Sequence, residues 1–150
     1  MSWSAPAVAT LISGRPIVID GDTLEIDGIV IRLHAIDAPE LRQTCISSGG
    51  RRWPCGEHAA EVLYQRARQR IVHCQPMGRD RNRRVMARCS LDGIDLGGWM
   101  VREGWAIAYR RFGHDYISEE AEAQSARRGI WAGRFDPPWD WRRGKRHAIK

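Results

Sequence analysis

The stretch Val18-Ile-Asp-Gly-Asp-Thr-Leu-Glu-Ile26 continues through Asp27-Gly28 into Ile29-Val-Ile-Arg-Leu-His-Ala-Ile-Asp-Ala-Pro-Glu40. Its apolar and β-branched runs are short and are separated by Gly-Asp and Asp-Gly pairs. Asp-Gly between such runs is a strong signal for a β-hairpin. The sequence therefore predicts strands over residues 15–20, 23–26 and 29–36, so the chain begins as a β structure.

Acidic and cationic side chains lie where these strands end. Asp22, Asp37 and Glu40 offer hard oxygen ligands for a divalent cation and a base for a water molecule. Arg32 offers a planar fork for a phosphate. Each residue alone is more commonly a turn residue or half of an exposed ion pair, but together they favour metal-assisted cleavage of a phosphodiester.

Strand alternation places one condition on this site. In a regular strand Arg32 and Asp37 point to opposite faces. They meet only if the strand ends or bends near Ile36, and Pro39 favours such an end because it has no amide hydrogen for a ladder.

Composition narrows the class of partner. The chain has 150 residues, a single-domain length, and a formal net charge of +6. Of its 24 basic residues only Lys145 and Lys150 are lysines, so the other 22 are arginines. An excess of arginine suits a polyanion such as nucleic acid better than a solubilising surface, although a merely basic protein would share it. No stretch has the length of a membrane span.

The rest of the chain alternates strands and helices. Asp95 is a good N-cap, Ser118 can cap a third helix, and Gly104 and Gly129 are helix stops. From Phe135 onward the prolines and basic residues predict a loose tail. We expect helices over 56–70, 95–103 and from 118 to about 128, further strands over 71–75 and 85–91, and basic turns over 78–84. The order predicts an α+β, mainly β, small barrel with helical packing.

The four cysteines pair most simply as Cys45–Cys55 and Cys74–Cys89. Reduced structural thiols are the main alternative. A zinc site is less favoured because no C-x-x-C spacing is present, although His34, His58 or His73 would be available as ligands. Disulfides imply a secreted or periplasmic protein. The first twelve residues lack a basic region and an uninterrupted apolar region, so a cytoplasmic location is the alternative.

Three segments together resemble the signature of the staphylococcal nuclease (thermonuclease) family. They are Asp20-Gly21-Asp22-Thr23, Arg32 with Asp37-Ala38-Pro39-Glu40, and Asp80-Arg81-Asn82-Arg83-Arg84. The resemblance runs from about residue 17 to 133, and Gly104-Trp105-Ala106, Tyr109 and Gly129-Ile130-Trp131 extend it. It implies a five-stranded OB-type barrel with three helices. We divide the chain into an extension (1–14), a nuclease domain (15–133) and a basic tail (134–150).

The resemblance also implies roles for single residues. Asp22 and Asp37 would bind Ca²⁺ by their side chains and Ala38 by its carbonyl oxygen. Glu40 would be the general base. The scissile phosphate would be held by Arg32 and Arg84, and the terminal phosphate and sugar of the nucleotide would be contacted by Arg81 and Tyr109.

The chain departs from the family at two of these positions. Ala38 replaces a threonine, which is harmless if only the carbonyl coordinates. Asn82-Arg83 stands where the family usually has Tyr-Gly. If position 83 needs a positive φ, Arg83 there costs on the order of 1 kcal/mol, and it could displace Arg84 or bind the phosphate itself.

The sequence leaves three candidate functions. The leading one is a calcium-dependent, largely sequence-nonspecific endonuclease acting on DNA and RNA, expected to be a monomer. The second is a catalytically weak or inactive OB-type domain that binds nucleic acid through a basic groove and stacked aromatics. The third is a reader of methylated arginine, and nothing in the sequence shows the clustered aromatics that it would need. The stacking candidates are Trp53, Trp105, Tyr109 and Phe112, of which Trp105 is more commonly a core residue.

Overall fold

The computed structural model describes residues 10–148, and its main sheet is mixed. The sheet order is β1-β8-β9-β4-β3-β2, with β10 paired to β9. The β4–β9 pair is parallel and the other pairs are antiparallel. The strands are β1 (Ile12–Gly14), β2 (Ile17–Asp20), β3 (Thr23–Ile26), β4 (Ile29–Leu33), β8 (Val72–Arg79), β9 (Val85–Leu91) and β10 (Ile94–Asp95).

The predicted α+β class is therefore correct, but the five-stranded barrel is not confirmed. The path from β1 to β2 stays open, because the two end strands are not paired to each other within the described residues. Part of the expected N-terminal extension joins the sheet, since Ile12 pairs with Cys74. Residues 1–9 of that extension lie outside the described residues. Two small pairs complete the β structure: β5 (Ile36–Asp37) with β11 (Ile107–Ala108), and β6 (Cys45–Ile46) with β7 (Arg52–Trp53).

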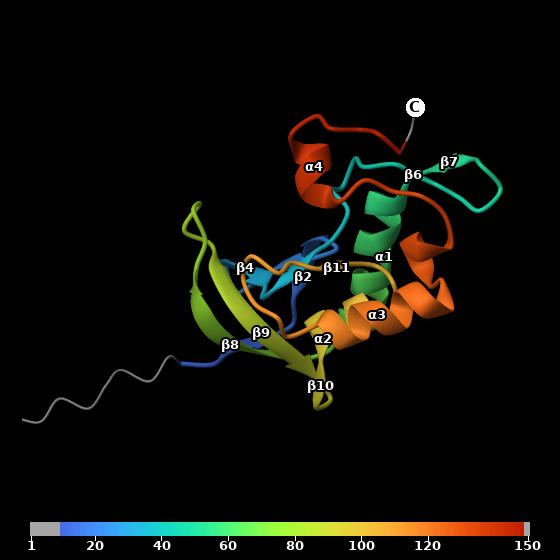
Figure 1. Ribbon diagram of the computed structural model, residues 1–150. Helices are drawn as coiled ribbons and strands as arrows, with labels where there is room; N and C mark the ends of the chain where they lie inside the picture. The colour runs from blue at the N-terminus through green and yellow to red at the C-terminus, as the bar shows by residue number, and fades with distance from the viewer. Residues whose placement is uncertain (1–9, 149–150) are drawn as a thin grey trace, which may run out of the picture.

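Three helices form where the sequence predicted them. They lie together beside the curved sheet in Figure 1. Asp95 caps the second of them, because its carboxylate accepts the Gly98 amide at 2.9 Å. The helices are α1 (Cys55–Ala67), α2 (Leu96–Arg102) and α3 (Ile117–Ala126), and a 3-10 turn, η1, covers Gly129–Ala132.

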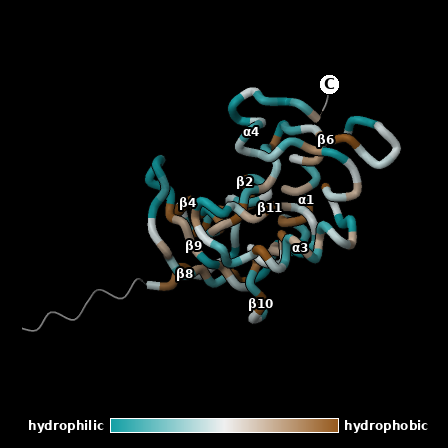
Figure 2. Tube along the Cα trace, in the orientation of Figure 1, coloured by the Kyte–Doolittle hydropathy of each residue, from teal (hydrophilic) through white to brown (hydrophobic). Residues whose placement is uncertain are grey.

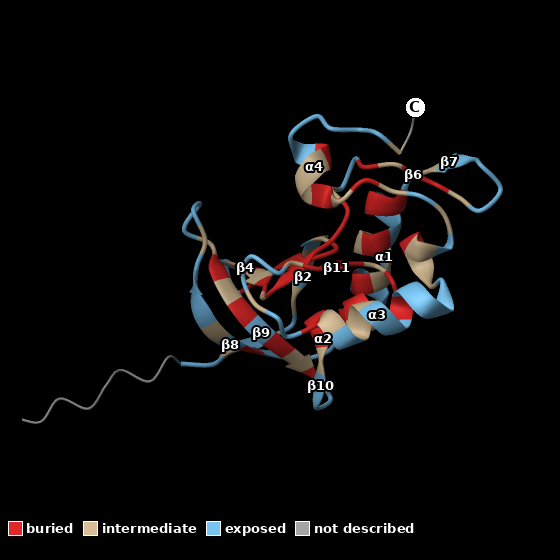
Figure 3. Cartoon of the chain, in the orientation of Figure 1, coloured by how far each residue is buried: buried red, intermediate tan, exposed pale blue. Residues whose placement is uncertain are grey.

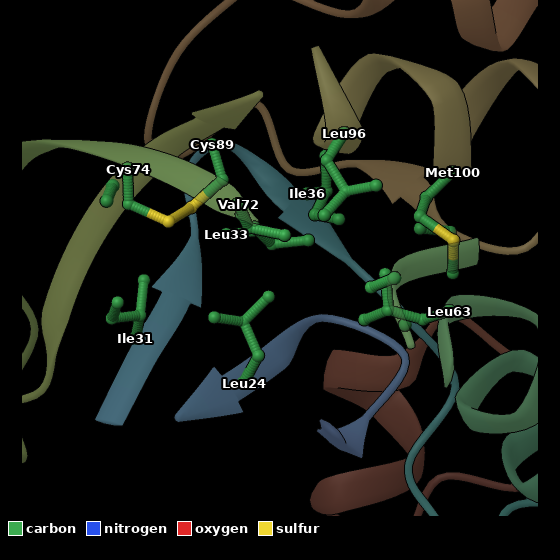
Figure 4. Packing of buried hydrophobic residues seen from close by; sticks show 14 of the residues in the cluster. Leu24, Ile31, Leu33, Ile36, Leu63, Val72, Cys74, Cys89, Leu96 and Met100 are labelled. Carbon is green, nitrogen blue, oxygen red and sulfur yellow. A yellow bond between two sulfur atoms is a disulfide. The ribbon is translucent and has the colours of Figure 1, made fainter. Parts of the chain in front are cut away.

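The core lies between the inner face of the sheet and these helices. Strand β9 alternates buried and more exposed residues, as a half-buried strand must, and Figure 3 shows this alternation. Leu24, Ile31 and Leu33 of β3 and β4 are almost completely buried. Figure 4 shows them packed beside the Cys74–Cys89 disulfide, which joins directly opposed residues of β8 and β9.

Both predicted cysteine pairs are disulfides in the structure. The second, Cys45–Cys55, ties the loop before α1 to the start of that helix and lies in a separate small core with Ile107 and Ile130. Residues 10–148 contain no helix of the length and apolar character that a membrane crossing requires.

The predicted loose tail is wrong over part of its length. Residues Pro138–Arg142 form a fourth helix, α4, which lies above α1 in Figure 1. Pro138 stands in the first turn, where a missing amide hydrogen costs nothing, and Trp141 is buried. Figure 2 shows that the chain after α4 is hydrophilic, as is the tip of the β8–β9 hairpin. The helix brings basic side chains back toward the strand ends.

Candidate active site

Asp22 lies in the tight turn between β2 and β3 and is buried. Its Oδ2 accepts the Ala38 amide at 2.8 Å, and its Oδ1 accepts the Thr23 hydroxyl at 2.8 Å. Gly21 makes this approach possible, since a Cβ there would lie 2.8 Å from the Cβ of Ala38. The turn therefore holds Asp22 against the Asp37-Ala38 segment, as the metal-site prediction requires.

Arg32 joins the two predicted metal-binding carboxylates. Its Nη1 lies 3.5 Å from Asp22 Oδ1, and its Nη2 lies 3.3 Å from Asp37 Oδ1. The bend that strand alternation required is present: β4 ends at Leu33, and Ala35 takes a φ of 60° before β5 begins. The chain thus turns Asp37 to the side on which Arg32 lies.

A further carboxylate, Asp20, lies beside Asp22. Burial and the neighbouring charge of Asp22 raise the pKa of Asp20 to about 8. Burial also opposes the charge of Asp22, but Arg32 and the hydrogen bonds from its neighbours outweigh it and lower the pKa of Asp22. The two shifts have opposite directions, so the pair favours a charged Asp22 beside a protonated Asp20 at neutral pH.

Glu40 is fixed through its backbone. The Glu40 amide donates to Gln43 Oε1 at 3.1 Å, and the Gln43 amide donates to the Glu40 carbonyl at 2.7 Å. The start of α1 packs closely against the same carbonyl, because a Cβ on Gly56 would lie 1.7 Å from its oxygen. The side chain of Glu40 is 32% exposed, so solvent reaches the proposed base.

Arg142, the last residue of α4, reaches the same carboxylates. Its Nη1 donates to Asp37 Oδ1 at 2.9 Å and to Glu40 Oε1 at 2.5 Å, and its Nη2 donates to Asp37 Oδ2 at 2.8 Å. The hydrogen bonds to Asp37 raise the pKa of Arg142 above its already high value. Sequence reasoning missed this residue.

Arg84 comes from the turn between β8 and β9. An arginine at position 83 would be strained only if its φ were positive. Arg83 does take a φ of 62°. The turn is nevertheless ordered by Asp80, which accepts the Asn82 and Arg84 amides at 2.9 Å and the Arg84 Nε at 2.6 Å. Arg84 is therefore held in place despite the strained neighbour.

Arg32, Glu40 and Arg84 line one open cleft of about 450 Å³. The buried residues Asp22, Asp37 and Ala38 lie behind its wall, in contact with Arg32 or with one another, and do not line it. Arg81, which was predicted to contact substrate, lies on its wall, whereas Arg83 is absent from the lining and borders a second hollow between β8 and the β3–β4 turn. The cleft is lined by Asp20, Arg32, Glu40, Asp80, Arg81, Asn82, Arg84, Tyr109, Arg111, Phe112, Trp139, Arg142 and Arg143.

Aromatic rings form one side of the cleft. Tyr109 is positioned by its amide, which donates to the Ala35 carbonyl at 2.9 Å. Its ring stacks on Trp139 of α4, with centroids 5.3 Å apart and planes at 10°, and meets Phe112 edge-on at 5.0 Å. Tyr109 and Phe112, two of the four stacking candidates, thus lie at the cleft.

The other two candidates lie elsewhere. Trp105 stacks on His58 with centroids 4.7 Å apart, and Trp53 meets Trp105 edge-on at 6.2 Å. Both tryptophans pack against core clusters and neither lines the cleft. Trp105 is therefore a packing residue, as its more common use predicts.

The donor atoms at the site limit which metal ion it could hold. Across residues 10–148 no group of three or more His, Cys, Asp or Glu side chains is arranged as a metal site, and all four cysteines are in disulfides. No thiolate therefore remains within the described residues to bind zinc. Asp22, Asp37 and the adjacent Ala38 carbonyl offer hard oxygens only, the donor type that calcium prefers, and a calcium ion held there would need further ligands.

Two residues of the site were not predicted from the sequence. Arg142 and Trp139 arrive on α4, more than a hundred residues beyond Asp37 in the case of Arg142. The available signal was the run Pro137-Pro-Trp-Asp-Trp141, in which a helix-starting proline precedes two large aromatic residues. Two tryptophans this close together indicate a segment that packs against the protein and not a tail exposed to solvent.

A cleft lined by partly buried carboxylates and several guanidinium groups, with two fully buried carboxylates beside it, is the arrangement expected of an enzyme that cleaves phosphodiesters. Comparison with known proteins agrees. The family described as staphylococcal nuclease homologue matches residues 30–133, which is more than half of the chain. The chain belongs to this family and is an enzyme of the nuclease class.

Three relatives illustrate the range of the family. The succinoglycan biosynthesis protein ExoI of Rhizobium meliloti (strain 1021) is 35% identical over 134 residues, covering 87% of this chain and 70% of its own. An Escherichia coli protein described as an uncharacterized endonuclease is 31% identical over 153 residues, covering 96% and 92%. A probable staphylococcal-like nuclease of Oryza sativa subsp. japonica is 32% identical over 121 residues, covering 79% and 34%.

Proposed function

We propose that the chain is a calcium-dependent endonuclease that hydrolyses phosphodiester bonds of DNA and RNA with little sequence preference. The observation that carries this proposal is that Arg32, Glu40 and Arg84, which come from three separate segments, line one cleft. A phosphate between the two guanidinium groups would lie beside a solvent-accessible carboxylate. The relatives named as endonuclease or nuclease support the same activity.

Asp22 and Asp37 would hold the cation by their side chains and Ala38 by its carbonyl. When bound, calcium would supply positive charge to a phosphate oxygen and to water. The protein's own contribution would be rigidity, because both carboxylates are buried and tied to Arg32. Charges fixed in advance need no rearrangement as the reaction proceeds.

Glu40 would take the proton from the attacking water or orient that water. Arg32 and Arg84 would clamp the scissile phosphate and stabilise the charge that develops on it. A forked donor suits this task because it binds two oxygens at once. Asp80 would keep Arg84 aimed into the cleft through the 2.6 Å contact.

Arg81 and Tyr109 would contact the substrate beyond the scissile phosphate. Side chains of this kind contact backbone and base faces without reading base edges, which explains the expected lack of sequence preference. The arginine-rich surface would attract DNA and RNA alike. We also infer an oxidising, secreted or periplasmic compartment, which the two disulfides support, and propose that the protein acts as a monomer.

The test is a cleavage assay on supercoiled plasmid, single-stranded DNA and RNA, each with calcium and with EDTA. The proposal predicts cleavage of all three with calcium and none with EDTA. Binding of these polymers without any cleavage would instead favour the inactive nucleic-acid-binding domain. Undiminished cleavage in EDTA would exclude the calcium-dependent mechanism.

A further inference from the structure

The C-terminal helix delivers a third guanidinium to the carboxylates of the site. Arg142 donates hydrogen bonds to both carboxylate oxygens of Asp37 and to one of Glu40. The side chain of Asp37 is completely buried, whereas 35% of the Arg142 side chain is exposed. Two parallel N–H···O bonds to one carboxylate form the strongest type of side-chain ion pair.

The helix that carries Arg142 is anchored at several points. Trp141 is buried, and Trp139 lies flat on Tyr109 with its centroid 5.3 Å away. Gln43 Nε2 donates to the Asp136 carbonyl at 2.7 Å, and the same Gln43 holds the Glu40 amide. Arg142 is thus presented by a docked element that is linked to Glu40 through Gln43.

Arg142 and a cation make opposing demands on Asp37. Asp37 Oδ1 already accepts from both Arg32 and Arg142, and Oδ2 accepts from Arg142. Each carboxylate oxygen has only two lone-pair sites. A divalent cation at Asp37 would also meet the guanidinium charge at close range, where like charges repel strongly.

We propose that Arg142 is a positioning residue that holds Asp37 and Glu40 in the absence of a cation and competes with the cation for them, so that calcium binding undocks α4. This inference rests on the proposed function, because it concerns the same cation site. Coupling of this kind is reciprocal: docked α4 weakens calcium binding by the same factor by which calcium weakens docking. Docking of α4 would then regulate calcium binding at the active site of the same chain.

The first test measures calcium affinity by titration calorimetry on the full chain without nucleic acid. Arg142→Gln is expected to bind calcium at least tenfold more tightly than the wild type. Arg143→Gln is the matched control, because it removes the same charge from the same cleft without a contact to Asp37. It should stay within about threefold of the wild type.

Arg142→Lys separates charge from the forked contact. Lysine keeps the charge but cannot grip both oxygens of Asp37, so its calcium affinity should lie between those of the wild type and Arg142→Gln. Calcium affinity in Arg142→Gln that equals the wild-type value, or falls below it, would overturn the inference. An equal gain in Arg143→Gln would also overturn it, because general charge would then explain the effect.

Hydrogen exchange gives a readout that does not depend on activity. In the wild type, calcium should speed exchange of the Arg143 and Lys145 amides, which both donate to the Asp140 carbonyl when α4 is formed. Unchanged or slower exchange in calcium-saturated protein would contradict undocking. Failure of every variant to bind calcium would remove the cation from the proposed function and this inference with it, a pattern distinct from normal binding without a variant effect.

Discussion

Asp80 and Arg84 are joined by both main chain and side chain, since Asp80 Oδ1 accepts the Arg84 amide at 2.9 Å and Asp80 Oδ2 accepts the Arg84 Nε at 2.6 Å. One carboxylate therefore sets both the shape of the β8–β9 turn and the direction of the arginine that leaves it. This arrangement lets Arg84 face the cleft although Arg83 beside it has a left-handed backbone.

Asp80→Asn should weaken this turn in a pH-dependent manner. Burial works against the charge of Asp80, but hydrogen bonds from Arg84 and Asn82 outweigh it and lower its pKa. The resulting stabilisation is fully present above about pH 4, the pKa of an unfolded aspartate, and is lost as the pH falls through the lower pKa of the folded state. Denaturant unfolding should show a larger gap between wild type and Asp80→Asn at pH 7 than at pH 3.

The matched control is Asp92→Asn. Asp92 forms an ion pair with Arg70 on the surface. Its φ is positive, but asparagine tolerates that conformation, so the substitution adds no backbone strain. Exposed ion pairs contribute little, so this variant should change the free energy of unfolding by no more than about 0.5 kcal/mol at either pH. A pH-independent gap for Asp80→Asn would show that the Asp80 charge does not order the turn.

Arg83→Gly should stabilise the protein by roughly 0.5–1 kcal/mol. Arginine at a φ of 62° carries a left-handed penalty of about 1–2 kcal/mol, from which the greater chain entropy of glycine in the unfolded state subtracts. Arg81→Gly, in the same turn but without a positive φ, should be neutral or destabilising. The comparison is made by thermal unfolding, and a loss of stability in Arg83→Gly would refute the strain argument.

Arg32→Gln and Arg84→Gln should separate catalysis from stability. Each should reduce kcat by a factor on the order of 10²–10³, the usual effect of removing one donor to a developing charge. Arg32→Gln should also lower the free energy of unfolding by about 3 kcal/mol, because Arg32 compensates the buried Asp22 and Asp37. Arg84→Gln should cost less, about 1 kcal/mol or below, because it removes only a partly exposed contact with Asp80. Equal stability losses in the two variants would contradict these separate roles.

The disulfides should account for all four cysteines. Titration of thiols in denatured, unreduced protein should find none. Replacing Cys74 and Cys89 together by alanine should cost about 3 kcal/mol, as expected for a bridge that closes a loop of this length. Four free thiols in protein made under oxidising conditions would contradict both pairs and the inferred compartment.

The local parts of the site could be predicted because they follow from neighbours in sequence. Asp22 meets Arg32 since the hairpin pairs Thr23 with Arg32, and the Asp-Gly turn that sets this register is explicit in the chain. The bend that brings in Asp37 was predictable only as a condition. It depends on a positive φ at Ala35, and alanine gives no signal for that conformation.

Helix α4 could not be predicted in the same way. Five residues are too few for a helical period to show, and an isolated helix of this length is unstable. The contacts of Trp139 with Tyr109 and of Arg142 with Asp37 supply its stability, and both join distant parts of the chain. The prolines and tryptophans of 137–141 indicate that this part of the tail packs, but the sequence alone does not show what it packs against.

The role of Glu40 is the central claim, and single-turnover cleavage by Glu40→Gln tests it most directly. Glu57→Gln, which makes the same change at an exposed position of α1, is the control. At saturating calcium and DNA, Glu40→Gln should cleave 10²–10⁴ times more slowly, on the order of a lost general base, while DNA affinity stays near the wild-type value. Cleavage by Glu40→Gln at the rate of Glu57→Gln would contradict the account.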